Sequence, residues 1–301
     1  METYKPLERR TPDTQYRDRL RHILEHGEMV KETPQGVGAL TCFGTLPQMV
    51  FDLTNGVPLI TERSANGFWR KAVGEIIAFI NGARTLDEIA AYGCDFWEDY
   101  RGKGATLGLD PDDMGPGSYG PAFHDFETPF YKTLNSRQTL DQFKQVLEQI
   151  RLYPTMRTHL VTPWKPYYTA RGPNRKVIVA PCHGWLHFGV MNGRLDMLMN
   201  QRSADFPVGV PSNMIQYAAL LLMMSQVTGF PPGNYVHGFI GNAHIYENQI
   251  ESVHRLIERK AHAFPILRLD PMVHNLFDFR VEHFELEEYH PHPAMKIPYS
   301  P

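Results

Sequence analysis

The sequence predicts a single α+β domain spanning residues 1–301. Segments with helical spacing of apolar residues alternate along the whole chain with short runs typical of strands. No segment repeats, and no low-complexity linker or change in composition divides the chain. With 301 residues, of which 42% are hydrophobic, the chain is long enough to bury one large core.

The clearest helix signals are the ends of two apolar segments. Residues 72–81 stop at Gly82, and residues 213–228 stop at Gly229, which is typical of a helix C-terminus. Residues 101–121 are rich in Gly, Pro and Asp and are expected to form a long loop, which in compact domains is often functional. The expected helices are residues 13–26, 72–81, 86–92, 140–152, 213–228 and 245–257.

The strongest strand signal is the pair Asn192-Gly193. Two residues of this type between apolar runs predict a tight hairpin joining residues 185–190 to 195–201. The expected strands are residues 39–44, 48–53, 159–163, 177–180, 185–190, 195–201 and 235–240.

Composition and charge exclude several classes of protein. A net charge of −3 provides no general basic field for nucleic acid. Three widely spaced cysteines predict free thiols in a reducing compartment. The polar N-terminus lacks a signal-peptide core, and no apolar run is long enough to cross a bilayer. The pair His290/His292 lacks further ligands, so we expect no metal. From the absence of a signal peptide and of a membrane-spanning run, we expect no membrane contact and a cytoplasmic location.

Cys182, in Ala-Pro-Cys-His, is the candidate nucleophile. We expect it on an apolar strand, where neighbouring side chains face opposite sides, so a Cys182–His183 dyad is poorly placed to cooperate. Arg202 is the better cationic partner for a thiolate. The alternative, that Cys182 is a buried free cysteine acting as a small hydrophobe, stays open.

Several motifs, in order, resemble those of the thymidylate synthase family. They are Ala-Pro-Cys-His (180–183), Gln-Arg-Ser-Ala-Asp (201–205), Gly-Val-Pro-Ser-Asn (209–213), Ala-His-Ile-Tyr-Glu-Asn (243–248) and His-Pro-Ala-Met-Lys (292–296). The resemblance runs from Gly36 to Pro298. It implies a large mixed β-sheet with flanking helices, and sheets packed back to back in a homodimer. It also implies a pyrimidine nucleotide substrate and 5,10-methylenetetrahydrofolate as co-substrate.

The resemblance assigns catalytic roles to matching residues. Cys182 resembles the thiolate that adds to C6 of uracil, with Arg202 lowering the thiol pKa and binding the phosphate. Asn213 resembles the residue that reads O4 and N3–H, although a helix N-cap is the alternative. Glu75 resembles the general acid/base at O4, its apolar setting raising its pKa, and an ordinary helix carboxylate is the alternative. Tyr119 resembles the tyrosine that helps remove the C5 proton through water.

Further matches concern binding. The substrate-binding positions are Arg157, Arg202, Ser203, Asn213, His244 and Tyr246. Arg157 resembles a residue that reaches across the dimer, and His244 and Tyr246 resemble the pair that binds the ribose 3′-hydroxyl. Taken singly, His244 and Tyr246 also fit ordinary core residues. Cofactor-binding positions are Trp97, Asp205, Gly209 and Lys296, with Asp205 on the loop between Arg202 and Asn213. The C-terminal segment resembles the tail that closes over both ligands, with a frayed end as the alternative.

The chain departs from the family at the phosphate and folate sites. Thr158 and the segment Pro34-Gln35-Gly36 stand where arginines are expected. Each lost contact costs about 1.5–3 kcal/mol unless replaced; the candidate replacements are Lys31, Arg171, Arg175 and Lys176. Near the reacting carbon, smaller or more polar residues stand at Ser212, Tyr100 and Val179.

The resemblance implies reductive methylation of dUMP to dTMP, with dihydrofolate as the second product. The alternative is a pyrimidine-nucleotide 5-hydroxymethylase (dUMP or CMP/dCMP type) that releases tetrahydrofolate, because the changed folate pocket gives water more room. A third hypothesis is a catalytically inactive nucleotide- or RNA-binding relative, favoured by the missing arginines and opposed by the intact Cys182 and Glu75.

Overall fold

The computed structural model describes residues 4–127 and 139–300. The α-helices are α1 (Gln15–His26), α2 (Trp69–Ile80), α3 (Leu86–Ala90), α4 (Tyr119–His124), α5 (Gln142–Leu152), α6 (Pro166–Thr169), α7 (Gly209–Thr228) and α8 (Ile250–Ile257). The 3₁₀ helices are η1 (Leu7–Arg9), η2 (Leu53–Asn55), η3 (Glu98–Tyr100), η4 (Lys103–Leu107), η5 (Glu247–Gln249), η6 (Leu276–Asp278) and η7 (Val281–His283).

The centre of the fold is a mixed seven-stranded sheet in the order β1-β2-β9-β8-β7-β6, with β3 also paired to β9. Only the β8–β9 pair of this sheet is parallel, so the predicted α+β class with a large mixed sheet is confirmed. The strands are β1 (Glu28–Val30), β2 (Ala39–Phe43), β3 (Met49–Asp52), β4 (Phe126–Glu127), β5 (Thr139–Leu140), β6 (Leu160–Val161), β7 (Trp185–Met191), β8 (Arg194–Asp205), β9 (Pro232–Tyr246), β10 (Ile266–Leu269) and β11 (Phe284–Glu287).

The β7–β8 hairpin confirms the turn predicted at Asn192-Gly193. Both residues have positive φ, 52° and 76°, the backbone that a two-residue turn of this type requires. Met191 pairs with Arg194 directly across the turn. The hairpin register extends back to the first residue of β7, where Trp185 pairs with Asn200, close to Cys182 and Arg202 in the chain.

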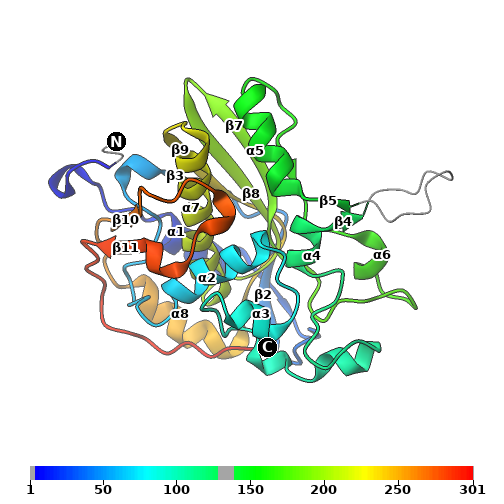
Figure 1. Cartoon of the computed structure of the whole chain (residues 1–301). Helices are drawn as coiled ribbons and strands as arrows, with labels where there is room; N and C mark the ends of the chain where they lie inside the picture. The colour runs from blue at the N-terminus through cyan, green and yellow to red at the C-terminus, as the bar shows by residue number, and fades with distance from the viewer. Residues whose placement is uncertain (1–3, 128–138, 301) are drawn as a thin grey trace.

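Helix α7 lies at the centre of the core and packs against α2, β8 and β9 (Figure 1). Of its twenty residues, all but a few at its two ends are buried. A helix buried on every side has no polar face, which explains its almost continuous apolar sequence. The helix ends where Gly229 adopts φ 82°, as the sequence predicts.

The structure corrects four expectations about local structure. Residues 177–180 do not form a strand, because they lie against residues 114–117, where Ile178 donates its N–H to the Met114 carbonyl. The helix expected from residue 245 begins at Ile250, because residues 245 and 246 pair with β2 at the end of β9. Helix α7 begins at Gly209, and the loop expected at residues 101–121 contains η4 and the start of α4.

No helix in the part of the chain that the structure describes is long and apolar enough to cross a membrane.

Candidate active site

Cys182 lies in the short irregular segment before β7, not on a strand as expected. Arg202, on β8, holds this segment: its Nε donates to the Pro181 carbonyl at 2.7 Å and its Nη2 to the Ala180 carbonyl at 2.8 Å. The same Nη2 lies 3.6 Å from Cys182 Sγ. The structure therefore brings the Arg202 guanidinium and the Cys182 sulfur together.

Strand β9 makes room for this arrangement at Gly241. A Cβ at that position would lie 2.3 Å from the Arg202 carbonyl oxygen, so any larger residue would push the two strands apart. The register of β8 and β9 shifts between Gln201 and Ser203, beside the same residue. The glycine and the register shift together set the position of Arg202 at the sulfur.

The net effect on the Cys182 pKa differs from the expectation. Burial raises the pKa of the thiol, and this exceeds the lowering by Arg202 and by the hydrogen bond from Ser203. The thiol therefore predominates in the ligand-free site. Arg202 and Ser203 are the two groups that favour its ionisation.

Tyr119, the first residue of α4, holds the backbone of Cys182 through its hydroxyl. Its hydroxyl accepts the backbone N–H of Cys182 at 2.7 Å and that of His183 at 3.4 Å. Its ring stacks on Phe79 and on His183, each with centroids 4.6 Å apart. The His183 ring binds the Tyr217 hydroxyl at 2.6 Å, which agrees with the prediction that it is poorly placed to serve Cys182.

Glu75 is a buried carboxyl on α2, only 5% exposed. Its Oε1 accepts the indole N–H of Trp97 at 2.7 Å, and its Oε2 accepts Nε2 of Gln216 at 2.8 Å. Burial raises the Glu75 pKa from 4.5 to about 7, although both donors oppose the shift. A carboxyl with this pKa can hold or release a proton near neutral pH.

Asn213 is inside α7 and not at its N-cap, so that alternative is wrong. Its side chain is buried and bonded on both sides. Gln201 Nε2 donates to its Oδ1 at 3.1 Å, and its Nδ2 donates to Gln216 Oε1 at 3.0 Å. Gln216 thus touches both Glu75 and Asn213, the two residues expected to contact the pyrimidine.

His244 and Tyr246 are alternate residues of β9, with rings 4.8 Å apart. His244 Nδ1 binds the Asn242 side-chain oxygen at 2.7 Å, so the ring proton is on Nδ1. Burial lowers the His244 pKa to about 4, which keeps the ring neutral. Its Nε2 is buried without a partner among the described residues and is free to accept a hydrogen bond from a hydroxyl group.

Asp205 is the last residue of β8, not part of a loop. Gln249 Nε2 lies 3.2 Å from each of its oxygens, and burial raises the Asp205 pKa from 3.8 to about 6. Gly209, the first residue of α7, lies beside Asp205: a Cβ built there would lie 3.8 Å from Asp205 Cβ, an ordinary van der Waals distance, so a small side chain would fit at this position.

The C-terminal segment is docked, so the frayed-end alternative is wrong for the described residues. Gln249 Nε2 donates to the Pro298 carbonyl at 2.9 Å, and Asn248 Nδ2 lies 3.4 Å from Ser300 Oγ. The segment therefore ends beside Asp205, which Gln249 also binds. Lys296 is exposed on this segment.

The other basic residues expected to bind the phosphate or the cofactor make no contact with this cluster in the described part of the chain. Arg157 is exposed between α5 and β6, and Lys31 lies 3.8 Å from Glu247. Arg171, Arg175 and Lys176 line a separate hollow of about 380 Å³. Compensation for the missing phosphate arginines stays a prediction.

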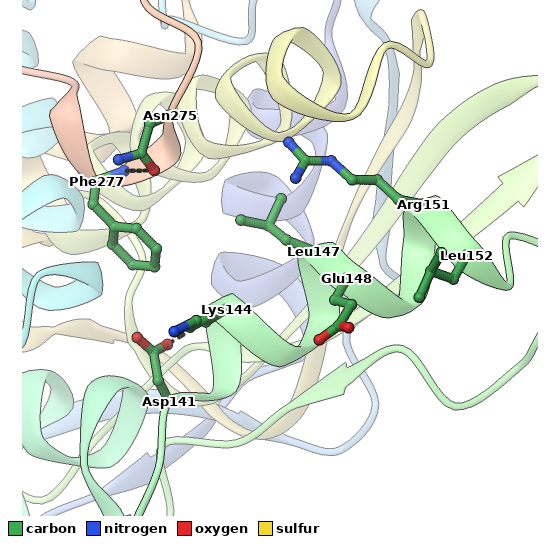
Figure 2. A pocket seen from close by; sticks show the side chains of 8 residues that line it. All are labelled: Asp141, Lys144, Leu147, Glu148, Arg151, Leu152, Asn275 and Phe277. Atoms are coloured by element: carbon green, nitrogen blue, oxygen red, sulfur yellow. Dashed lines mark hydrogen bonds between the residues drawn. The ribbon is translucent and has the colours of Figure 1, made fainter.

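Another hollow, of about 670 Å³, lies between α5 and residues 275–277 (Figure 2). Its charged lining includes Asp141, which caps α5 by accepting the Lys144 N–H at 2.9 Å, and Arg151, which donates to the Val227 carbonyl. None of its lining residues belongs to the cluster around Cys182. Its charged groups serve α5 and α7, and it offers no nucleophile.

Sequence reasoning missed the connecting residue Gln216 and gave Gln201 no role. A signal was available for the first: Gln216 is an isolated amide within the apolar run of α7. A buried polar side chain needs hydrogen-bond partners, so such a residue indicates a polar contact inside the core.

The site brings together a thiol beside a guanidinium, a buried carboxyl with a raised pKa, and a buried amide joined to that carboxyl through Gln216, which are groups typical of an enzyme site. A model of the thymidylate synthase family matches residues 14–301, and the chain belongs to that family. Members are folate-dependent one-carbon transferases that bind a pyrimidine nucleotide and use methylenetetrahydrofolate as co-substrate. No group of three His, Cys, Asp or Glu side chains in residues 4–127 and 139–300 is arranged to hold a metal.

Proposed function

We propose that this protein is a thymidylate synthase that converts dUMP and methylenetetrahydrofolate to dTMP and dihydrofolate. The observation that carries the proposal is the continuous contact from Glu75 through Gln216 to Asn213, beside a thiol held by Arg202. A nucleophile, a proton donor and a base-reading amide are the groups that substitution at uracil C5 requires. We expect the protein to act in the cytoplasm.

Cys182 starts the proposed reaction. Its thiol first releases its proton to water, which Arg202 and Ser203 favour; the sulfur then bonds to C6 of the pyrimidine, and the electrons of the C5=C6 bond move toward C5 and O4. Glu75 supplies a proton on the O4 side, and Asn213 holds N3–H and O4. After C5 gains the one-carbon unit and loses its proton, with Tyr119 assisting through water, the C6–S bond breaks and restores Cys182.

Methylenetetrahydrofolate supplies the one-carbon unit and, for a methyl product, the hydride. The residues proposed to hold it are Asp205, Gly209, Trp97 and Lys296. Asp205 fits a ligand with paired N–H donors, because its partly buried carboxylate now receives only long contacts, from Gln249 Nε2 at 3.2 Å to each oxygen and from the Val208 N–H at 3.3 Å to Oδ1. The docked C-terminal segment lies beside Asp205 and would exclude water there.

For the nucleotide's sugar and phosphate we propose two groups of residues. His244 Nε2, buried and without a partner among the described residues, accepts a hydrogen bond from a ribose hydroxyl, with Tyr246 beside it. Arg202 and Ser203 bind the phosphate, and Arg157 of a second copy completes the site. The exposure of Arg157 suits a residue that acts outside its own subunit.

A homodimer is proposed because the sheet has exposed apolar side chains where nothing in the described chain covers them. Each belongs to a strand and follows or precedes a core residue, so it points away from the helices. They are Phe43 of β2 (75% exposed), Val50 of β3 (44%) and Ile240 of β9 (55%). A second copy of the same face would bury them symmetrically.

The second candidate function is hydroxymethyl transfer to the same carbon. Ser212, Tyr100 and Val179, the three residues that depart from the family pattern, are all partly exposed to solvent. Water that reaches the one-carbon unit would give a product one oxygen heavier than dTMP and would leave tetrahydrofolate.

Purified protein incubated with dUMP and methylenetetrahydrofolate tests both candidates. Formation of dihydrofolate and of a nucleotide with the mass of dTMP supports the proposal. A nucleotide one oxygen heavier, without dihydrofolate, supports the hydroxymethylase. If neither forms and 5-fluoro-dUMP leaves no covalent adduct with the protein, the inactive binding relative becomes the better description.

The variant Cys182→Ala tests the nucleophile. We expect turnover to fall by about 10⁴-fold or more and the 5-fluoro-dUMP adduct to disappear. The matched control is Cys42→Ala, because Cys42 is a buried thiol on β2, paired with Ala243 of β9, and is not among the groups proposed to touch the ligands. Full turnover in Cys182→Ala would exclude the proposed mechanism.

A further inference from the structure

Four buried polar side chains form one directed series of hydrogen bonds. Gln216 Nε2 donates to Glu75 Oε2 at 2.8 Å, and Asn213 Nδ2 donates to Gln216 Oε1 at 3.0 Å. Gln201 Nε2 then donates to Asn213 Oδ1 at 3.1 Å. All four residues are less than 9% exposed, so water does not readily replace these bonds.

The direction of the series is set at both ends by groups that only accept. Gln201 Nε2 also donates to the Ser203 carbonyl at 2.9 Å, which fixes its amide. At the other end, the ionised Glu75 carboxylate accepts and cannot donate. Between these ends, reversing the amide of Asn213 would turn its Nδ2 toward Gln201 Nε2, donor facing donor.

This direction determines what Asn213 presents to a ligand. One N–H of its amide is used by Gln216 and one lone pair of its oxygen by Gln201. One N–H and one lone pair remain. They complement O4 and N3–H of uracil, whereas cytosine presents a donor and an acceptor in the opposite order.

Protonation of Glu75 changes the hydrogen bonds that its carboxyl can accept at one end of the series. Its two oxygens accept from Trp97 and Gln216, so a proton on the carboxyl displaces one of these donors or must face the ligand. When the bond to Gln216 weakens, the amide of Gln216 loses the acceptor that orients it, and Asn213 keeps only the restraint from Gln201.

We propose that Gln216 is a positioning residue that couples the ionisation of Glu75 to the orientation of the Asn213 amide and so sets the preference for uracil over cytosine. The proposal deepens the proposed function and rests on it for the identity of the nucleotide. The coupling itself is a property of the ligand-free protein.

The other titratable groups that interact with Glu75 remain uncharged while it titrates. They are Cys94, which precedes η3, Tyr119 of α4 and Tyr217 of α7. Burial raises the pKa of each of these groups far above its ordinary value. On α2 itself, Lys71 is directed to Asp95 at 2.8 Å. Near Asn213, the pKa of Asp205 is about 6, and that of His237, which contacts Gln201, is about 3. A midpoint at Asn213 that coincides with that of the Glu75 carboxyl carbon, and not with one near 6, therefore reports Glu75.

The test is an NMR titration of the ligand-free full-length protein, following the Glu75 carboxyl carbon and the Asn213 side-chain amide. In the wild-type protein both signals should move with one midpoint near 7, the pKa of Glu75. In Gln216→Met, which is similar in size but cannot bridge, the Glu75 midpoint should rise and the Asn213 signal should no longer follow it. An Asn213 signal that ignores Glu75 in the wild type, or still follows it in Gln216→Met, overturns the proposal.

The second readout is the ratio of affinities for dUMP and dCMP, which should fall by about 10-fold or more in Gln216→Met. An unchanged ratio overturns the part of the proposal that concerns specificity. Gln226→Met is the matched control, because Gln226 lies on the same helix and binds the backbone carbonyls of Asp270 and Val273 instead. It should leave both readouts unchanged.

A second variant and a separate interpretation of inactive protein keep the test decisive. If Gln216→Met does not fold, Gln216→Asn retains an amide that is one methylene too short to span both partners, with the same expected result. If wild-type protein turns over no nucleotide, the proposed function fails, while the NMR titration still decides the role of Gln216.

Discussion

The substitution Glu75→Gln should change how the stability of the protein depends on pH. Burial raises the Glu75 pKa from 4.5 to about 7. Between these values the folded protein retains a proton that the unfolded chain has released. Because the folded state binds more protons, the free energy of unfolding falls as pH rises through this window. Glutamine does not ionise and removes this dependence.

The size of the effect follows from the two pKa values. Raising the pKa from 4.5 to about 7 corresponds to about 3 kcal/mol at high pH, of which about 2.5 kcal/mol develops between pH 5 and pH 8. The amide also introduces a constant penalty of about 1–3 kcal/mol, because Trp97 and Gln216 both donate to a group that now offers one acceptor. The constant penalty cancels when two pH values are compared.

We therefore expect the free energy of unfolding of Glu75→Gln, minus that of the wild type, to rise by about 2.5 kcal/mol from pH 5 to pH 8. Urea denaturation of both proteins at one protein concentration measures it at each pH. A difference that stays constant or falls would refute the reasoning, because it would mean that the buried carboxyl titrates as in the unfolded chain.

Glu98→Gln is the matched control, because the pKa shift of Glu98 has the opposite direction to that of Glu75. Glu98 is an exposed carboxyl on η3, and its hydrogen bond with Arg101 lowers its pKa. The folded state then favours the ionised form, so its contribution to stability is present above the unfolded pKa of 4.5 and is lost as pH falls. The difference for Glu98→Gln should fall as pH rises toward 4.5 and should then stay almost constant from pH 5 to pH 8, where that for Glu75→Gln rises.

Two further predictions concern the folate pocket and the dimer. Burial raises the Asp205 pKa from 3.8 to about 6, so the free energy of unfolding of Asp205→Asn, relative to wild type, should rise by about 3 kcal/mol between pH 3 and pH 7. The same denaturation series measures this rise, and calorimetry should show a loss of folate binding. A rise confined to pH above 7 would contradict the raised pKa. Phe43→Lys should yield monomers in analytical ultracentrifugation with reduced turnover, whereas Met272→Lys, at an equally exposed position outside the sheet, should not. Dimers that persist in Phe43→Lys would exclude the proposed interface.

Local features of the chain were sufficient to predict many elements. Asn192-Gly193 specifies a tight turn because both residues tolerate positive φ, and Gly229 ends α7 for the same reason. Cys182 and Arg202 are also recognisable from their motifs, and the structure brings them together. These signals depend on neighbouring residues or on short motifs, so no distant contact is needed to interpret them.

Other features depended on contacts between distant segments. Residues 177–180 resemble a strand, but they pack on residues 114–117, and β9 extends to Tyr246 because β2 pairs with it. Glu75 and Gln216 are 141 positions apart, and no local pattern predicts that they touch. Hydrogen-bond partners and burial in the folded chain determine pKa values and amide orientations, so only the tertiary structure could show how a residue recognisable from sequence is tuned for its chemistry.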